Sequence, residues 1–253
     1  MLSFWSAYNS YSFDVYVDGL YTHRFKKEDV DSDKNKFRID LKKGTKKVSI
    51  YFSGFFAFKI KNVEISDNAK IKPVKKDRKF LFYGDSITQG YKTEFPSFTY
   101  SNIVSREFNA ECLNKGIGGD YYYPQFLDEK FSYKPDAIIV AFGTNDWSGG
   151  KDIETNAIEF YDKLTKLYPG VKIFTLLPLW RGKEGKENVI TYDEMREILI
   201  KVCKNYKDIT LIDAIDFIPH DGKFFLPDLL HPNTIGFRIY GENVINALKP
   251  YIE

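Results

Sequence analysis

The chain has 253 residues, 43% of them hydrophobic, with 37 basic and 35 acidic side chains and a formal net charge of +2. This length and composition permit a sizeable core and one or two domains. The near balance of charge argues against nucleic acid as a partner, because phosphate binding normally appears as a concentrated basic surface. The lysine-rich stretch at residues 70–79 is short and interrupted by Pro73, so we interpret it as an exposed linker.

Neither a secretory signal nor an apolar run of the roughly 20 residues that span a bilayer is found in the sequence. We therefore expect no membrane span. As given, the chain is expected to be cytoplasmic, or secreted if a leader has been removed.

Short strands dominate residues 1–72. Ser12–Val17 alternates between apolar and polar positions and leads into Asp18-Gly19, a strong hairpin signal, with residues 20–25 as the returning strand. Gly44 lies in a turn between residues 37–41 and 47–52, which predicts a second hairpin. Residues 57–65 alternate again. About five short strands predict a small β-sandwich, jelly-roll-like, that is thin for independent stability. This first domain could bind glycan, cover a cleft or support dimerisation, so both a monomer and a homodimer are open.

Residues 73–253 show a different pattern, in which apolar strands alternate with amphipathic helices. This pattern predicts a second domain of the α/β class, with a parallel sheet covered on both faces. Five strands are expected, at residues 79–83, 111–114, 137–142, 172–177 and 209–212. Helices are expected around residues 153–167, 195–206 and 237–248, the last one stopping at Pro250. Ligands of such sheets bind beyond the carboxyl ends of the strands, so the loops that carry Ser86, Gly119 and Asn145 should meet at one crevice.

Ser86 lies in Gly84-Asp85-Ser86, a turn between an apolar strand and a helix that can aim a hydroxyl at a ligand. His231 is the best base for it, because Asp228 can accept from one imidazole nitrogen and leave the other facing the serine. Alone, Asp-x-x-His would more often be a helix-capping turn. A nucleophile, a base and an orienting carboxylate are the minimum for acyl transfer through a covalent intermediate.

The other two histidines are weaker candidates. We expect His23 on a strand surface and His220 in a polar turn, either in solvent or lining the cleft. Asp228, His231, His220 and Asp221 could also be interpreted as metal ligands. No third cluster of liganding residues appears in the sequence, however, and a metal site would leave Ser86 unexplained. No metal and no cofactor are therefore expected.

Two turns offer donors for an oxyanion. Residues 114–120 form a glycine-rich turn after a strand, which can point a backbone N–H into the crevice, and neither G-x-G-x-x-G nor a Walker sequence is present. Asn145, in Gly143-Thr144-Asn145-Asp146, could supply a second donor and the Ser86 N–H a third. Either turn taken alone would more often be structural.

These four elements, in this order, resemble the SGNH (GDSL-type) esterase and lipase superfamily over roughly residues 78–253. The resemblance implies a flavodoxin-like three-layer fold. It also implies Ser86 as nucleophile, His231 as base, Asp228 as orienting acid, and Gly119 and Asn145 as oxyanion donors. Gly119 is chosen over the neighbouring glycines for its place directly before Asp120. The Gly-x-Ser-x-Gly elbow of α/β-hydrolases is absent around Ser86.

The β-rich first domain followed by this second one also looks like the two-domain carbohydrate esterases that remove acetyl groups from polysaccharides. Here the first domain is shorter than a full jelly roll. Some members of that group lack the acidic triad residue, whereas this chain has Asp228.

The resemblance implies a serine esterase for short acyl esters, with O-acetyl groups on carbohydrates or small molecules as the expected substrate. Trp147, Tyr121 and Trp180 follow strand ends and are candidate walls of the cleft, with packing as the alternative for each. A lysophospholipase or thioesterase is the first alternative, but no apolar insertion follows Trp147 or Trp180 to form a long groove. A non-catalytic carbohydrate-binding protein is the second, and it would show a broken motif, whereas none is broken.

Overall fold

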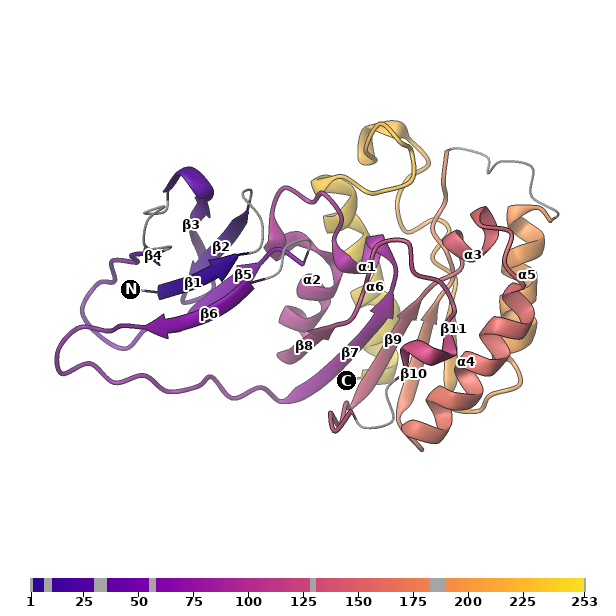
Figure 1. Cartoon of the computed structure of the whole chain (residues 1–253), viewed down its shortest axis with the longest axis horizontal. Helices are drawn as coiled ribbons and strands as arrows, with labels where there is room; N and C mark the ends of the chain where they lie inside the picture. The colour runs from indigo at the N-terminus through magenta and orange to yellow at the C-terminus, as the bar shows by residue number, and fades with distance from the viewer. Residues whose placement is uncertain are drawn as a thin grey trace. The chain divides into compact units, whose positions relative to one another are not determined.

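The computed structural model describes Leu2–Ser6 and residues 11–29, 36–54, 58–127, 131–182 and 190–252 (Figure 1). It divides into two compact units. The β-rich unit comprises Met1–Lys75 together with Glu94–Phe98, and the α/β unit comprises Lys76–Thr93 and Thr99–Glu253. A short segment from the middle of the sequence therefore belongs to the β-rich unit.

Two antiparallel sheets make up the described part of the β-rich unit. The first has the order β4-β1-β6 and the second β3-β2-β5. Tyr11, Phe13, Val15, Phe25 and Phe37 form the buried core of the unit. The strands are β1 (Leu2–Ser6), β2 (Ser12–Val17), β3 (Leu20–Lys26), β4 (Lys36–Phe37), β5 (Val48–Phe52) and β6 (Phe58–Val63), and a 3-10 turn at Lys27–Asp29 follows β3.

The first predicted hairpin is present and the second is not. Val17 pairs with Leu20 across Asp18 and Gly19, which both have positive φ (53° and 84°), as a type I′ turn requires. The predicted hairpin around Gly44 is wrong, because β4 pairs with β1 while β5 pairs with β2. The ring of Phe37 packs 4.4 Å from that of Phe13, so burial of this one residue outweighs the local turn signal.

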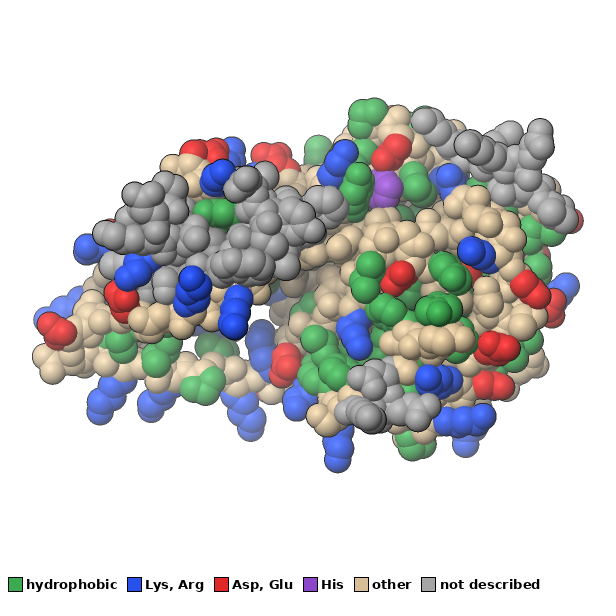
Figure 2. Space-filling view, in the orientation of Figure 1, with side chains coloured by type: hydrophobic (Ala, Val, Ile, Leu, Met, Phe, Trp, Pro, Cys, Tyr) green, Lys and Arg blue, Asp and Glu red, His purple; other side chains and the backbone are tan. Residues whose placement is uncertain are grey.

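Residues 70–77 are exposed, as expected for a linker, whereas Arg78 and Lys79 already belong to the next strand. Figure 2 shows lysine and arginine side chains along this extended segment, and basic and acidic side chains interspersed over the rest of the visible face.

The α/β unit contains the predicted five-stranded parallel sheet, in the order β11-β10-β9-β7-β8. Its strands are β7 (Arg78–Gly84), β8 (Ala110–Asn114), β9 (Ala137–Ala141), β10 (Lys172–Leu176) and β11 (Ile209–Ile212). The central strands β7 and β9 are fully buried over most of their length, which explains why their sequences are continuously apolar.

Helices cover the sheet in the three-layer arrangement expected (Figure 1). α2 (Tyr100–Glu107) packs against α6 (Thr234–Ile252), and α4 (Ile153–Leu167) packs against α5 (Tyr192–Cys203). The expected stop at Pro250 is wrong, since α6 continues to Ile252. In the last helical turn a proline removes only one backbone hydrogen bond, and the helix tolerates it.

Short helical segments occupy the loops of the α/β unit. α1 (Ser86–Gln89) follows β7 and α3 (Thr144–Ser148) follows β9, so both start at the carboxyl end of the sheet. The 3-10 turns are η3 (Pro124–Phe126) and η4 (Gly222–Phe224), while η2 (Pro96–Phe98) belongs to the β-rich unit. Within the described residues, no helix combines the length and apolar character needed to cross a bilayer.

Candidate active site

Ser86 is the first residue of α1, placed there by the end of β7. Asp85 is extended and caps the helix, its Oδ1 accepting from the Ile87 N–H at 2.8 Å. A Cβ atom at Gly84 would lie 2.8 Å from the Ala141 carbonyl oxygen, so only glycine lets β7 approach β9 this closely at the turn. The strand-to-helix turn therefore raises the serine at the carboxyl end of the sheet.

Ser86, His231 and Asp228 form one hydrogen-bonded chain. Ser86 Oγ lies 2.7 Å from His231 Nε2, and His231 Nδ1 lies 2.8 Å from Asp228 Oδ2. The sequence places these residues at opposite ends of the α/β unit, and the fold brings them together in the arrangement of a nucleophile, a base and an orienting acid.

Asp228 also shapes the turn that carries His231. Its Oδ1 accepts from the backbone N–H groups of Leu230 and His231, each at 3.0 Å. Leu229, inside this turn, has φ of 54°, a left-handed conformation that is strained for a leucine. The carboxylate thus stabilises the turn with one oxygen and orients the imidazole with the other.

Partial burial raises the pKa of Asp228, but the hydrogen bonds from His231 and Leu230 outweigh it and hold the pKa below its ordinary value. Asp228 is therefore ionised at neutral pH and accepts a hydrogen bond from the Nδ1–H group. This fixes the imidazole tautomer in which Nε2 is free to accept from the Ser86 hydroxyl.

Tyr91 packs on the imidazole and was not foreseen from the sequence. Its ring centroid lies 4.4 Å from that of His231 with the planes tilted by 42°, and its N–H donates to the Ser86 carbonyl at 2.9 Å. The only sequence signal is its position directly after Gly90, which ends α1 in a left-handed conformation. Tyr91 covers one side of the His231 imidazole.

Hydrogen bonds distinguish the three glycines of residues 114–120. The Gly116 N–H donates to the Asn114 side chain at 2.8 Å, and the Gly118 N–H donates to Gln89 Oε1 at 3.0 Å. Gly119 has φ of 86°, and its N–H has no acceptor among the described residues. Of the three, only Gly119 retains a backbone donor for a ligand.

This glycine turn lies directly against α1, which begins with Ser86. A Cβ atom at Gly118 would be 3.7 Å from Ser86 Cβ, and one at Gly116 would be 2.5 Å from the Gln89 nitrogen. The Ser86 N–H, at the first helical position, has no partner inside the helix. Two backbone donors, at Ser86 and Gly119, are therefore available beside the serine hydroxyl.

The turn after β9 is joined to the glycine turn by two contacts. Asn145 Nδ2 donates to the Asp120 carbonyl at 2.8 Å, which leaves the second amide hydrogen for a ligand. Asp146 is fully buried, and both of its carboxylate oxygens accept from the Tyr122 N–H, at 3.1 and 3.4 Å. These contacts hold Asn145 next to Gly119.

Two buried carboxyls lie behind the site. Burial raises the pKa of Asp85 to about 7, with the Ile87 hydrogen bond opposing and the charges of Asp146 and Asp120 adding to the rise. Burial likewise raises the pKa of Asp146 to about 7 against its bonds to backbone N–H groups. Both groups therefore exchange a proton near neutral pH. Within the described ranges, no group of three His, Cys, Asp or Glu residues is disposed to hold a metal.

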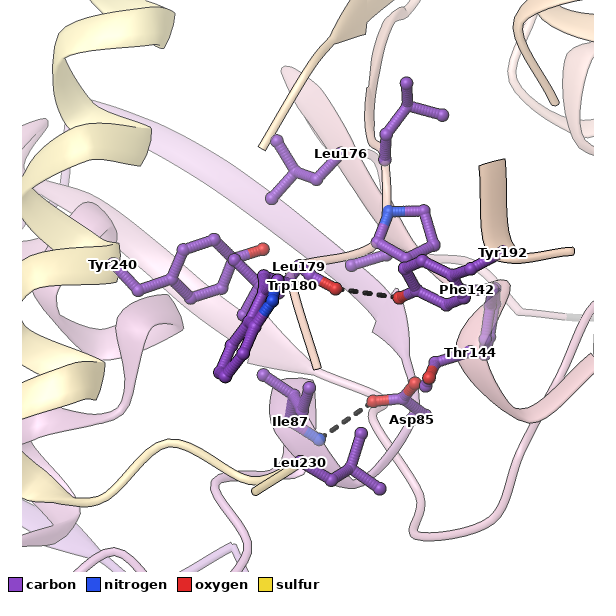
Figure 3. A pocket seen from close by; sticks show the side chains of 13 residues that line it. Asp85, Ile87, Phe142, Thr144, Leu176, Leu179, Trp180, Tyr192, Leu230 and Tyr240 are labelled. Atoms are coloured by element: carbon purple, nitrogen blue, oxygen red, sulfur yellow. Dashed lines mark hydrogen bonds between the residues drawn. The ribbon is translucent and has the colours of Figure 1, made fainter. Parts of the chain in front are cut away.

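A small pocket of about 20 Å³ lies next to the nucleophile turn (Figure 3). Figure 3 shows Asp85 bonded to the Ile87 N–H on one side, and the Tyr192 hydroxyl bonded to the Leu179 carbonyl on the other. Leu176, Trp180, Leu230 and Tyr240 are among the other residues that line the pocket. The space suffices for about one water molecule, and Ser86, His231 and Asn145 are not among the residues that line it.

The three candidate cleft walls have different surroundings. Trp147 is 8% exposed, belongs to the core and donates from Nε1 to the Ile190 carbonyl at 2.8 Å, so the structure places it in packing. Tyr121 lies under the Lys151 ammonium at 4.8 Å. Trp180 lines the small pocket and stacks on His220, with ring centroids 5.0 Å apart and planes within 12°. His220 is thus part of an aromatic pair, and His23 is exposed on β3 as expected.

Arg181, the neighbour of Trp180, contacts the turn after β9. Its Nη1 donates to Thr144 Oγ1 at 3.0 Å, and its guanidinium lies 5.0 Å from the Trp147 ring centroid. Burial lowers the pKa of Arg181, while the nearby Tyr192 and Asp228 oppose that change. The guanidinium therefore supports the turn that presents Asn145.

A five-stranded parallel sheet with this serine turn and these donor turns at its carboxyl end defines an acyl hydrolase of the SGNH type. The chain belongs to the GDSL-like Lipase/Acylhydrolase family, whose sequence profile matches residues 82–239. A search of curated proteins finds no matching sequence.

Solved structures share the fold over nearly the whole chain. A family two carbohydrate esterase from Clostridium thermocellum superposes with a TM-score of 0.76 at 18% identity, covering 98% of this chain and 88% of that one. An acetyl xylan esterase from the rumen bacterium Butyrivibrio proteoclasticus gives 0.63 at 16% identity, covering 98% and 86%. The salicylyl-acyltransferase SsfX3 of a tetracycline biosynthetic pathway gives 0.76 at 18% identity, covering 99% and 80%. The β-rich unit is therefore part of the shared architecture.

Proposed function

We propose that the protein is a serine esterase that hydrolyses short-chain acyl esters, O-acetyl groups on carbohydrates first among them, through an acyl-enzyme intermediate. The observation that carries the proposal is the hydrogen-bonded chain from Asp228 through His231 to Ser86, with contacts of 2.8 and 2.7 Å. No further group is needed to activate the hydroxyl.

In the first half of the reaction, His231 Nε2 removes the Ser86 proton as Oγ attacks the ester carbonyl carbon. The oxygen of the tetrahedral intermediate takes up the negative charge and accepts from the Gly119 N–H, the Ser86 N–H and the Asn145 amide. The intermediate collapses as the imidazolium returns its proton to the departing alkoxide. This step releases the alcohol and leaves the acyl group on Ser86.

In the second half, a water molecule takes the place of the alcohol. His231 removes one proton from the water, and the resulting hydroxide attacks the acyl carbonyl. Collapse releases the carboxylic acid and returns the proton to Ser86 Oγ. In both halves the ionised Asp228 carboxylate stabilises the imidazolium, because its pKa is held low by the bonds from His231 and Leu230.

The solved structures that share the fold support a short acyl group. Similar folds include an acetyl xylan esterase and a family two carbohydrate esterase solved with cellohexaose. On this basis we assign acetyl as the acyl group and a carbohydrate hydroxyl as the leaving alcohol.

Ser86→Ala tests the reaction type. The variant should lose about 10⁴- to 10⁶-fold in kcat on p-nitrophenyl acetate and should not react with a fluorophosphonate probe that labels the wild type. Undiminished turnover by Ser86→Ala would rule out the covalent mechanism.

Comparing acetate, octanoate and palmitate esters tests acyl length, and a preference for palmitate would replace the proposal by a lipid acyl hydrolase. Release of acetate from acetylated xylan tests the alcohol.

A further inference from the structure

Two consecutive residues after β10, Arg181 and Gly182, contact two different turns of the candidate site. The side chain of Arg181 reaches the turn after β9, which presents Asn145. The backbone of Gly182 reaches the turn that carries His231. All of these residues belong to the α/β unit. One short segment therefore contacts both the oxyanion side and the base side of the site.

The contact on the oxyanion side is a hydrogen bond to Thr144. Arg181 Nη1 donates to Thr144 Oγ1 at 3.0 Å. Thr144 is buried, begins α3 and directly precedes Asn145. A bond from a charged donor is stronger than one between neutral groups, and a buried hydroxyl depends on its partners because water does not replace them. The position of Thr144, and with it the start of the Asn145 residue, therefore depends on Arg181.

Aromatic side chains hold the guanidinium in place. It lies 5.0 Å from the Trp147 ring centroid, within the range of a cation–π interaction. Tyr192 packs edge-on against the same indole, with ring centroids 5.0 Å apart and planes at 75°. The Tyr192 hydroxyl donates to the Leu179 carbonyl at 2.7 Å, two residues before Arg181 (Figure 3). The arginine is thus a fixed part of this turn and differs from a mobile surface cation.

The contact on the base side is a backbone hydrogen bond to Leu229. The Gly182 N–H donates to the Leu229 carbonyl at 2.8 Å. Leu229 lies between Asp228 and His231 in the sequence and has φ of 54°. Such a strained conformation persists only where surrounding contacts hold it, and this bond is one of them. Gly182 therefore stabilises the turn that directs the imidazole at the serine.

The close approach of the two segments requires glycine at residue 182. A Cβ atom there would lie 2.8 Å from Trp180 Cη2 and 3.0 Å from Leu229 Cβ. Any larger residue would displace either the indole or the base turn. The packing of Gly182 against Leu229 is therefore as specific as the bond from Arg181 to Thr144.

We propose that Arg181 is a positioning residue that, together with Gly182, connects the Asn145 turn to the His231 turn. This inference rests on the proposed roles of Asn145 as an oxyanion donor and His231 as the base. The tetrahedral intermediate needs both groups at once, because the amide donates to its oxygen while the imidazolium holds the serine proton. The connection keeps donor and base at the spacing that this step requires. Arg181 acts through Thr144 and not through the substrate.

Arg181→Met and Thr144→Val test the connection from its two ends. Methionine keeps much of the packing of the arginine stem and removes the donor, while valine removes the acceptor. Each variant should lose about 10-fold in kcat on p-nitrophenyl acetate with KM little changed, because small misplacements of a catalytic group have effects of this size. The double variant should be no slower than the slower single variant, since both substitutions break the same bond. Arg181→Lys keeps a charged donor and should recover part of the loss.

The Asn145→Ala background separates positioning from a general structural role. Without the amide that it positions, Arg181→Met should cost less than about 2-fold. A structural defect would lower kcat by the same factor in both backgrounds. Gly182→Ala should lose about 10-fold through the base turn and, unlike Arg181→Met, should keep this loss in the Asn145→Ala background.

Arg238→Met is the matched control. Arg238 is also in the α/β unit and donates from Nε to Glu242 Oε1 at 2.9 Å, but on the exposed face of α6. It should keep wild-type kcat. The number of active sites is titrated with a fluorophosphonate, so that unfolded protein does not count as slow protein. If Arg181→Met does not fold, Thr144→Val takes its place in both backgrounds.

Unchanged kcat per active site in Arg181→Met and Thr144→Val would overturn the proposal. So would a loss in Arg181→Met that remains complete in the Asn145→Ala background. A wild-type protein that does not react with the fluorophosphonate would instead refute the proposed esterase function itself.

Discussion

Asp228→Asn should impair catalysis more than Asp228→Ala, although asparagine is the closer replacement. The asparagine oxygen can keep the backbone bonds that Asp228 Oδ1 accepts, while the amide nitrogen takes the place of Oδ2, 2.8 Å from His231 Nδ1. An amide NH₂ donates and cannot accept. Nδ1 must then give up its proton to Nε2, which presents a hydrogen to Ser86 Oγ in place of a lone pair.

The expected loss in kcat/KM of each Asp228 variant follows from the hydrogen bonds that the substitution removes or adds. Loss of the charge-assisted bond to the imidazolium costs about 1.5–3 kcal/mol, and the amide bond that stabilises the inactive tautomer adds about 0.5–1.5 kcal/mol. The sum of about 2–4.5 kcal/mol corresponds to a loss of roughly 30- to 2,000-fold in kcat/KM. Alanine removes only the first contribution and should lose roughly 10- to 150-fold. The Asp228 side chain is 40% exposed, so water can enter beside alanine and accept from Nδ1.

The assay is kcat/KM on p-nitrophenyl acetate from mildly acidic to mildly alkaline pH, with thermal melting to exclude unfolding. Asp221→Asn is the matched control, because Asp221 also caps a turn, accepting from the Lys223 N–H at 3.0 Å, and is exposed. It should retain wild-type rates. An alanine variant as slow as the asparagine variant, or slower, would refute the tautomer argument.

Two further predictions concern groups behind the site. Gln89→Ala removes the acceptor of the Gly118 N–H and should lower kcat about 10-fold, less than full loss of an oxyanion donor, whereas Gln125→Ala, on an exposed turn, should not. Burial raises the pKa of Asp85 to about 7, so the folded state binds this proton more tightly than the unfolded state and stability falls as pH rises from about 4 to about 7. Asp85→Asn should shrink the difference in Tm across that window, and an unchanged difference would contradict a raised pKa.

The α/β unit was predictable because its signals are local. Strands such as β9 are continuously apolar, α4 repeats apolar residues every three or four positions, and both follow from burial within one segment. The predicted hairpin around Gly44 failed because the partners of Phe37 lie far away in sequence. Turn composition carries no information about such partners.

The site was predictable to the extent that chemistry demands certain residue types. A serine, a histidine and a carboxylate can be sought by type, but a tyrosine that packs on the histidine cannot, and Tyr91 was missed for that reason. The excursion of Glu94–Phe98 into the β-rich unit was missed likewise, because its donors are ordinary backbone and hydroxyl groups.

The two halves of the site are stabilised differently, and this determines where substitutions should act. The oxyanion side is tied within the α/β unit by the Asn145 bond to Asp120 and the Gln89 bond to Gly118. The base side depends on a turn with a strained Leu229 and on the loop that carries Tyr91. Changes on the oxyanion side remove charge stabilisation at every pH, whereas changes on the base side alter proton transfer. Variants of the Tyr91 loop should therefore change the pH dependence of kcat. Variants of Gln89 should lower kcat by the same factor at every pH.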